Sequence, residues 1–197
     1  MSVVEFLLAG TLAAAMPLLL AALGELVVER TGGLNLGLEG MMALGAVIAF
    51  ICVYHSGSHL IGFLAAAIAG AAFAMVFAGL VLVIKANEVA AGLAIGVLGL
   101  GLSALFGKSY ESHTIKGLPD YRLPVLSEIP VIGPTFFTQD VVVWITVIGT
   151  ASLWYVLNKT KLGLIITAVG ENSEAARSIG YPVGAIRCAA IAFGGGM

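Results

Sequence analysis

The chain has 197 residues, of which 60% are hydrophobic and only 10% are charged, and its mean hydropathy is +1.08. Because an ordinary soluble domain is about 25% charged, this composition indicates a membrane protein. The net charge of −2 gives no indication of a basic surface that would bind nucleic acid. The two cysteines both lie in apolar runs, and they have neither the pattern of a disulfide-bonded domain nor the spacing of metal ligands.

Five stretches of the chain are apolar and long enough to cross a bilayer, which takes about 20 residues. In chain order we place these spans at residues 5–27, 38–54, 60–84, 88–106 and 140–157. The first is too long and too poor in basic residues to be a signal peptide. The sequence thus predicts an all-α fold, a polytopic transmembrane helix bundle that forms one domain over residues 1–197.

A sixth apolar stretch begins near Ala185 and reaches Met197 at the end of the chain. It is too short to cross a bilayer by itself. We therefore expect five full spans plus the start of a sixth, in a chain that is truncated at its C-terminus.

A glycine-rich polar stretch, TGGLNLGLEG at residues 31–40, separates the first two spans. Within lipid, irregular backbone is tolerated only where protein or a water-filled cavity satisfies it, and transporters build their pathways at such breaks. Asn35 and Glu39 are the polar side chains of this break. A carboxylate at the bilayer centre costs about 2.5–3.5 kcal/mol, so a deep Glu39 must face a cavity or a partner. Both residues are pathway candidates, and interfacial positions are the alternative.

Other polar residues lie near the ends of the predicted spans. Asn87 and Glu88 open the fourth span and are either pathway residues or helix caps. Glu25 and Glu29 lie one turn apart at the end of the first span, where we expect them to be interfacial. His55 and His59 have a possible metal spacing, but we expect them in an outer turn. We find no catalytic set and no metal or cofactor motif, so we expect no enzyme.

The basic residues predict the orientation of the spans, because cytoplasmic loops carry an excess of Lys and Arg. One arrangement puts six of them inside and three outside, with an external N-terminus. Those inside are Arg30, Lys85, Lys159, Lys161, Arg177 and Arg187, and those outside are Lys108, Lys116 and Arg122.

The two longest connections differ in character. Residues 107–139 form an external, proline-rich loop, which is either a connector or a docking surface for an external partner. Residues 158–184 form a cytoplasmic loop in which Asn172 or Ser173 caps a short helix over residues 173–179, ended by Gly180 and Pro182. That helix either contacts a cytoplasmic partner or rests on the membrane as an amphipathic connector.

Three strings of this sequence resemble permease subunits of bacterial ABC importers for simple sugars, nucleosides and branched-chain amino acids. The stretch ELVVERTGGLNLGLEGMM at residues 25–42 is similar to the family signature, and is closest to the nucleoside group. NEVAAGLA at residues 87–94 resembles a second segment, with Glu88 in place of the usual glutamine. LGL at 162–164 and AVGENSEAAR at 168–177 resemble the cytoplasmic loop that contacts the ATPase.

The resemblance implies a multi-pass protein of the bacterial plasma (inner) membrane. It implies four kinds of partner besides the lipid bilayer: ABC ATP-binding subunits, a second permease subunit, an extracytoplasmic solute-binding protein and a small-molecule substrate, with no nucleic acid and no cofactor. The substrate would be a nucleoside, or alternatively a simple sugar. Residues matching the ATPase-coupling loop are Gly170, Glu171, Asn172, Ser173, Glu174, Ala175, Ala176 and Arg177.

Two other classes of membrane protein compete with this interpretation. An ion-coupled secondary transporter also uses broken helices, but more often has an acid or base in mid-span. A structural membrane protein would not need the glycine-rich break. Co-purification of an ATPase with the full-length protein would separate the three.

Overall fold

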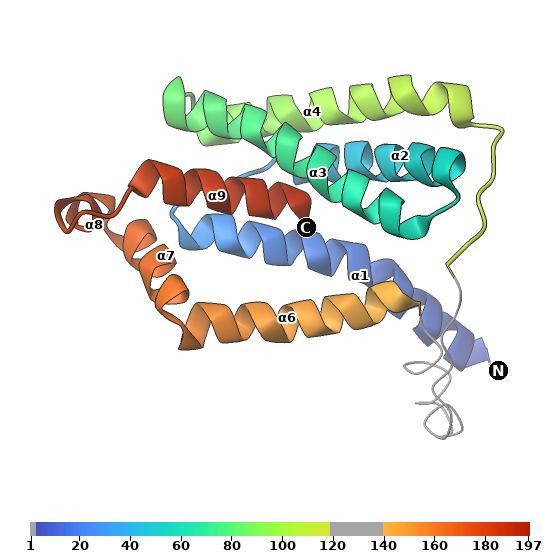
Figure 1. The fold of residues 1–197 in the computed structure, drawn as a ribbon, viewed down its shortest axis with the longest axis horizontal. Helices are drawn as coiled ribbons and strands as arrows, with labels where there is room; N and C mark the ends of the chain where they lie inside the picture. The colour runs from blue at the N-terminus through green and yellow to red at the C-terminus, as the bar shows by residue number, and fades with distance from the viewer. Residues whose placement is uncertain (1–2, 119–139) are drawn as a thin grey trace. The chain divides into compact units, whose positions relative to one another are not determined.

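A computed structural model describes residues 3–118 and 140–197 of the chain, and every regular element in these ranges is helical (Figure 1). The polytopic helical fold predicted from the sequence is confirmed. The elements are α1 Val3–Arg30, α2 Leu38–Ser56, α3 His59–Ala78, the π-helical turn η1 Gly79–Val83, α4 Glu88–Gly107, the 3-10 turn η2 Lys108–Tyr110, α6 Val141–Lys159, α7 Lys161–Glu171, α8 Ser173–Ser178 and α9 Val183–Gly196.

Five helical stretches are long and apolar enough to cross a membrane, and each matches one predicted span. They are Phe6–Arg30, Leu38–Ser56, His59–Val83, Glu88–Tyr110 and Val141–Lys159. The first and fourth run three or four residues further than the sequence predicted. All prolines of the predicted 107–139 loop lie outside the described residues.

The chain divides into two compact units, and both α1 and α6 contribute to each. The first unit holds residues 3–20 of α1 and residues 141–155 of α6 among those described. Three threonine hydroxyls of this unit, those of Thr11, Thr146 and Thr150, donate to carbonyls of their own helices. Thr11 Oγ1 donates to the Leu7 carbonyl at 2.8 Å, and Thr146 Oγ1 donates to that of Val142 at 2.8 Å. Such bonds allow threonine in an apolar helix, where a free hydroxyl would be costly.

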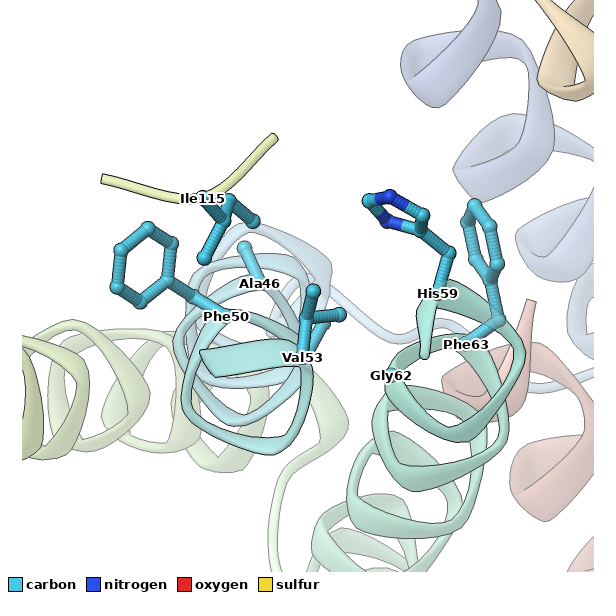
Figure 2. A pocket seen from close by; sticks show the side chains of 8 residues that line it. Ala46, Phe50, Val53, His59, Gly62, Phe63 and Ile115 are labelled. Atoms are coloured by element: carbon cyan, nitrogen blue, oxygen red, sulfur yellow. The ribbon is translucent and has the colours of Figure 1, made fainter. Parts of the chain in front are cut away.

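In the second unit, residues 21–115 and 156–197, α2 and α3 form a tight helical pair. Gly57 ends α2 with a φ of +68°, a left-handed conformation that glycine adopts without steric cost. Near this turn the two helices and Ile115 line an open apolar hollow of about 210 Å³ (Figure 2). It is lined by Ala46, Ala49, Phe50, Val53, His59, Gly62, Phe63 and Ile115.

The two histidines near this turn lie in helix ends, so their prediction as loop residues is wrong. His55 belongs to the last turn of α2, and His59 is the first residue of α3. His55 Nε2 is 2.9 Å from Tyr110 Oη, which joins the end of α2 to η2. No group of three His, Cys, Asp or Glu among the described residues could hold a metal ion.

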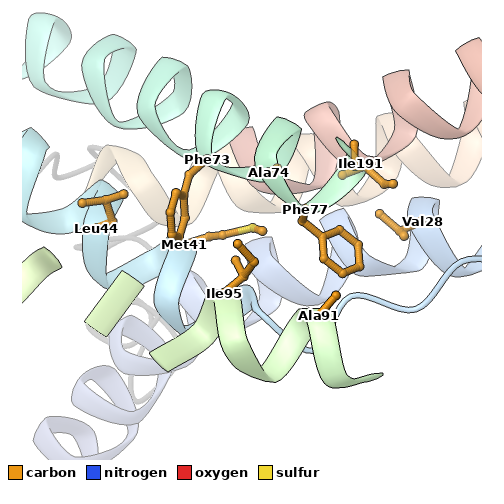
Figure 3. Close-up of a cluster of buried hydrophobic side chains, with 10 residues drawn as sticks. Val28, Met41, Leu44, Phe73, Ala74, Phe77, Ala91, Ile95 and Ile191 are labelled. Carbon is orange, nitrogen blue, oxygen red and sulfur yellow. The ribbon is translucent and has the colours of Figure 1, made fainter. Parts of the chain in front are cut away.

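The core of the second unit lies where α3 packs against α2 and α9, and α2 packs against α4 (Figure 3). Apolar side chains from all four helices meet there with Val28 of α1. Its buried members are Val28, Met41, Leu44, Phe73, Ala74, Phe77, Ala78, Ala91, Ile95 and Ile191.

Helices α2 and α4 approach through backbone rather than side chains. A Cβ built on Gly40 would collide with the Gly96 carbonyl oxygen, and one on Gly99 would lie 2.5 Å from the Gly40 carbonyl oxygen. Small residues allow this approach where no hydrophobic effect drives helices together. Gly92 and Gly96 of α4 are buried as well, and a Cβ built on Gly92 would lie 2.8 Å from Leu36 N.

Candidate functional site

The predicted break is a non-helical loop of residues 31–37 between α1 and α2. Two carboxylates from neighbouring helices accept hydrogen bonds from its backbone. Leu34 N donates to Glu88 Oε2 at 2.9 Å, and Asn35 N donates to Glu25 Oε1 at 2.7 Å. Buried backbone N–H groups without an acceptor are costly, and these two bonds supply one to each amide. The loop is therefore held by α1 on one side and by α4 on the other.

The Asn35 side chain is only 1% exposed and stabilises the loop from within. Its Oδ1 accepts a hydrogen bond from Gly37 N at 3.0 Å, and its Nδ2 lies 3.5 Å from the Met41 sulfur. An asparagine that bonds the backbone two residues ahead shapes a turn. This turn leads directly into α2.

The other three pathway candidates occupy different environments. Asn87 Oδ1 accepts a hydrogen bond from Ala90 N at 3.1 Å, so Asn87 caps α4, as one of its two readings predicted. Glu88 is half-buried on the loop, whereas Glu39 is exposed in the first turn of α2. A carboxylate in a first helical turn is favoured by the helix dipole. None of these four residues lines the hollow between α2 and α3.

Glu25 belongs to this site but is not among the predicted pathway residues. It was expected to be interfacial together with Glu29, which is exposed. In the structure Glu25 Oε1 accepts a hydrogen bond from Asn35 N, and its Oε2 is buried with no hydrogen-bond partner among the described residues. No local pattern separates Glu25 from Glu29, because α1 is apolar on all sides; the difference depends on how the loop folds back onto α1.

The segment of residues 158–184 is more helical than the sequence predicted. It contains a whole amphipathic helix, α7. Thr160 caps the start of this helix, because its Oγ1 accepts a hydrogen bond from Gly163 N at 3.4 Å. Gly170 and Glu171, expected in a loop, lie in the last turn of α7. Apolar residues at positions 162, 165, 166 and 169 have the spacing of a helix face, which could have revealed it.

The short helix predicted next in this segment is present as α8 and ends at Ser178, one residue early. Asn172 is its cap, since Asn172 Oδ1 accepts from Ala175 N at 2.9 Å. Gly180 follows with a φ of +100°, which stops the helix.

A buried apolar cluster joins α7, α8 and α9 into one body. Val169, Ala176 and Val183 contribute one buried side chain from each helix, and Ile186 packs against them. The polar residues Glu171, Glu174 and Arg177 are exposed. Helix α8 therefore presents a charged surface while its alanine face is fixed to its neighbours.

This body also touches the start of the α1–α2 loop. Arg187 Nε donates to the Thr31 carbonyl oxygen at 3.0 Å, although the two residues are 156 positions apart. A Cβ built on Gly170 would collide with the Arg30 carbonyl oxygen and lie 3.0 Å from Gly32 N. The helix segment and the loop are thus in direct backbone contact.

Comparison with known proteins decides the family of this helical chain. Residues 7–197 match the family described as branched-chain amino acid transport system / permease component. The chain belongs to this permease family. Proteins of this kind are multi-pass membrane components of transporters and are not themselves enzymes, and the helices agree with that assignment.

Several curated relatives of this permease chain are named for sugars or nucleosides. A putative glucose ABC transporter permease of Haloferax volcanii is 38% identical over 100% of this chain and 61% of its own length. A guanosine ABC transporter permease of Bacillus subtilis is 33% identical over 92% and 60%, respectively. A nucleoside ABC transporter permease of Lactococcus lactis is 32% identical over 97% and 64%.

The chain therefore spans about three fifths of the length of these curated relatives. No solved structure matches it significantly.

Proposed function

We propose that the full-length protein is the membrane-spanning permease subunit of an ATP-driven importer in the bacterial plasma (inner) membrane. The observation that carries this proposal is the loop of residues 31–37, a break between membrane helices whose backbone is bonded by Glu25 and Glu88. Such bonds let an irregular segment exist at membrane depth, where a path for a polar solute needs polar groups.

In this proposal Glu39 contributes a polar group to the path, and Asn35, Asn87 and Glu88 shape the break. Glu39 is the exposed carboxylate of the four. Asn35 and Glu88 hold the loop in place, and Asn87 fixes the start of α4 beside it. The solute would pass by alternating access, with no covalent chemistry on this subunit.

ATP would be hydrolysed by separate ATP-binding subunits that contact α8. A helix with one face fixed by Val169 and Val183 and an opposite charged surface suits a partner's cleft. This arrangement supports the cytoplasmic coupling role of residues 158–184 over that of a connector lying on the membrane. A second permease subunit would complete the path, and a solute-binding protein would deliver the substrate from outside.

The substrate we propose is a nucleoside, because the string of residues 25–42 is closest to the nucleoside group and two relatives are named for nucleoside transport. A simple sugar is the second candidate, favoured by the relative of Haloferax volcanii named for glucose. Both are small polar solutes with several hydroxyl groups.

The test is uptake into proteoliposomes that contain the full-length protein with its ATP-binding subunits. Radiolabelled guanosine and radiolabelled glucose are offered in turn with the solute-binding protein outside. We expect uptake of guanosine that requires enclosed ATP and persists when ionophores dissipate ion gradients. Uptake driven by an ion gradient without ATP would contradict the proposal and indicate a secondary transporter. ATP-driven uptake of glucose but not of guanosine would show that a simple sugar, not a nucleoside, is the substrate.

A further inference from the structure

The α1–α2 loop, residues 31–37, is anchored at both of its ends, and the two anchors belong to different parts of the second unit. Its first two residues contact α7 and α9, whereas Leu34 and Asn35 are bonded by side chains of α4 and α1. A short segment fixed at two places transmits displacement from one to the other.

The first anchor is Arg187, which lies in the second turn of α9 and is half-buried. Its Nε–H donates to the carbonyl of Thr31, directly after the C-terminus of α1. A guanidinium is favoured there because the last carbonyls of a helix carry partial negative charge. Thr31 is itself held, since its Oγ1 donates to the Val28 carbonyl at 2.7 Å.

Gly170 and Gly32 add a steric contact to this anchor. A Cβ built on Gly32 would lie 3.0 Å from an Arg187 guanidinium nitrogen and 3.1 Å from the Gly170 carbonyl oxygen. Gly32 also has a φ of +77°, which side chains rarely adopt. The C-terminal end of α7 and the N-terminal part of α9 therefore both lie against Thr31 and Gly32.

Only Gly33 separates these residues from the second anchor, at Leu34 and Asn35. From Thr31 to Asn35 the backbone spans at most about 14 Å, at about 3.3–3.6 Å for each residue. The Glu88 and Glu25 carboxylates hold the far end at 2.9 and 2.7 Å. The two anchors are thus within four residues of each other on one short segment, so a movement of α9 at Thr31 acts close to the residues that α4 and α1 hold.

We propose that Arg187 is the positioning residue that connects the ATPase-coupling segment to the break in the membrane path. Movement of α8 passes to α7 and α9 through the Val169–Ala176–Val183 cluster, and Arg187 pulls on Thr31. The loop then shifts Leu34 and Asn35 against Glu88 and Glu25. This inference rests on the proposed function, because it assigns a route for the ATP-driven step.

The test uses the full-length permease assembled with its ATP-binding subunits and binding protein in proteoliposomes. Arg187→Gln removes the guanidinium, and Arg187→Lys retains a positive donor. Lys108→Gln is the control, since Lys108 is an exposed positive charge in η2, after the end of α4 opposite to Glu88. Each is combined with Leu36→Cys, since Leu36 is 44% exposed in the loop and reports its movement by thiol labelling. Labelling is compared without nucleotide and after trapping with ATP and vanadate.

We expect the Arg187→Gln variant to assemble and to hydrolyse ATP at the basal rate. Its Leu36→Cys labelling should no longer change between the two states, and its uptake rate should fall about tenfold, which is within the usual range for coupling between two sites. Arg187→Lys should recover part of both, and Lys108→Gln should match the wild type. If Arg187→Gln retains both the labelling change and the wild-type uptake rate, the inference is overturned. Loss of assembly in both Arg187 variants would also overturn it, since the Arg187 bond would then be purely structural. If the wild type shows no ATP-driven uptake, the proposed function itself fails.

Discussion

The glycine contact between α2 and α4 gives a sharp prediction about stability. Gly99→Ala places a methyl group where a Cβ would lie 2.5 Å from the Gly40 carbonyl oxygen and 2.7 Å from Gly40 Cα. Both are backbone atoms, so neither can move aside as a flexible side chain would, and the helices must separate. Overpacking of this kind typically costs about 1–3 kcal/mol.

Gly101→Ala is the matched control, because Gly101 lies on the same helix and a Cβ there meets nothing within 4 Å. Both variants gain the same helix propensity, which is worth up to about 1 kcal/mol for glycine to alanine. The difference between them therefore isolates the contact. We expect the free energy of unfolding of Gly99→Ala to lie about 1–3 kcal/mol below that of Gly101→Ala.

The assay is reversible unfolding of the full-length protein in mixed micelles, with increasing denaturing detergent and circular dichroism as the readout. A difference of about 1.4 kcal/mol changes the ratio of folded to unfolded protein tenfold, which such a titration resolves. Equal unfolding curves for the two variants would refute the close backbone packing of α2 and α4.

Three further predictions concern α8, the topology and the loop. Ala176→Gly should reduce uptake and solute-stimulated ATP hydrolysis more than Ala175→Gly, because both lose about 1 kcal/mol of helix propensity but only Ala176 is buried against Val169 and Val183. Equal losses of uptake in the two variants would contradict a role of the Val169–Ala176–Val183 cluster in coupling. Cysteine at Ser112 should react with an impermeant thiol reagent from outside, and cysteine at Ser178 only after permeabilisation; the reverse pattern would invert the predicted orientation. Glu88→Ala should raise amide hydrogen exchange at Leu34, measured by mass spectrometry, because Leu34 N loses its acceptor; unchanged exchange would contradict that bond.

The sequence predicted the spans well because each is specified by a long local property. Apolar runs near 20 residues are legible without any tertiary information, and the helices begin and end within a few residues of the predicted limits. The caps Asn87 and Asn172 were also readable, since a cap bonds an amide only three residues ahead.

Contacts between distant segments could not be predicted in this way. The bond from Arg187 to Thr31 joins residues 156 positions apart, and the bond from Leu34 to Glu88 joins residues 54 apart. Both depend on how the helices pack, which depends in turn on backbone approaches such as Gly40 to Gly96. Helix α7 was overlooked for a different reason. Its 11 residues include Gly163 and Gly170, which local rules assign to loops, but here neighbouring backbone occupies the space of their side chains.

Uptake by Glu39→Ala tests most directly the claim that the break between α1 and α2 forms the solute path. The variant is made in the full-length protein, with Glu29→Ala as the control, because Glu29 is also an exposed carboxylate but lies on α1, before the break. Membrane insertion, assembly with the ATP-binding subunits and ATP-driven uptake are measured for both. We predict that both insert and assemble normally and that only Glu39→Ala loses uptake. Uptake by Glu39→Ala at the wild-type rate would contradict the assignment of the path to this break.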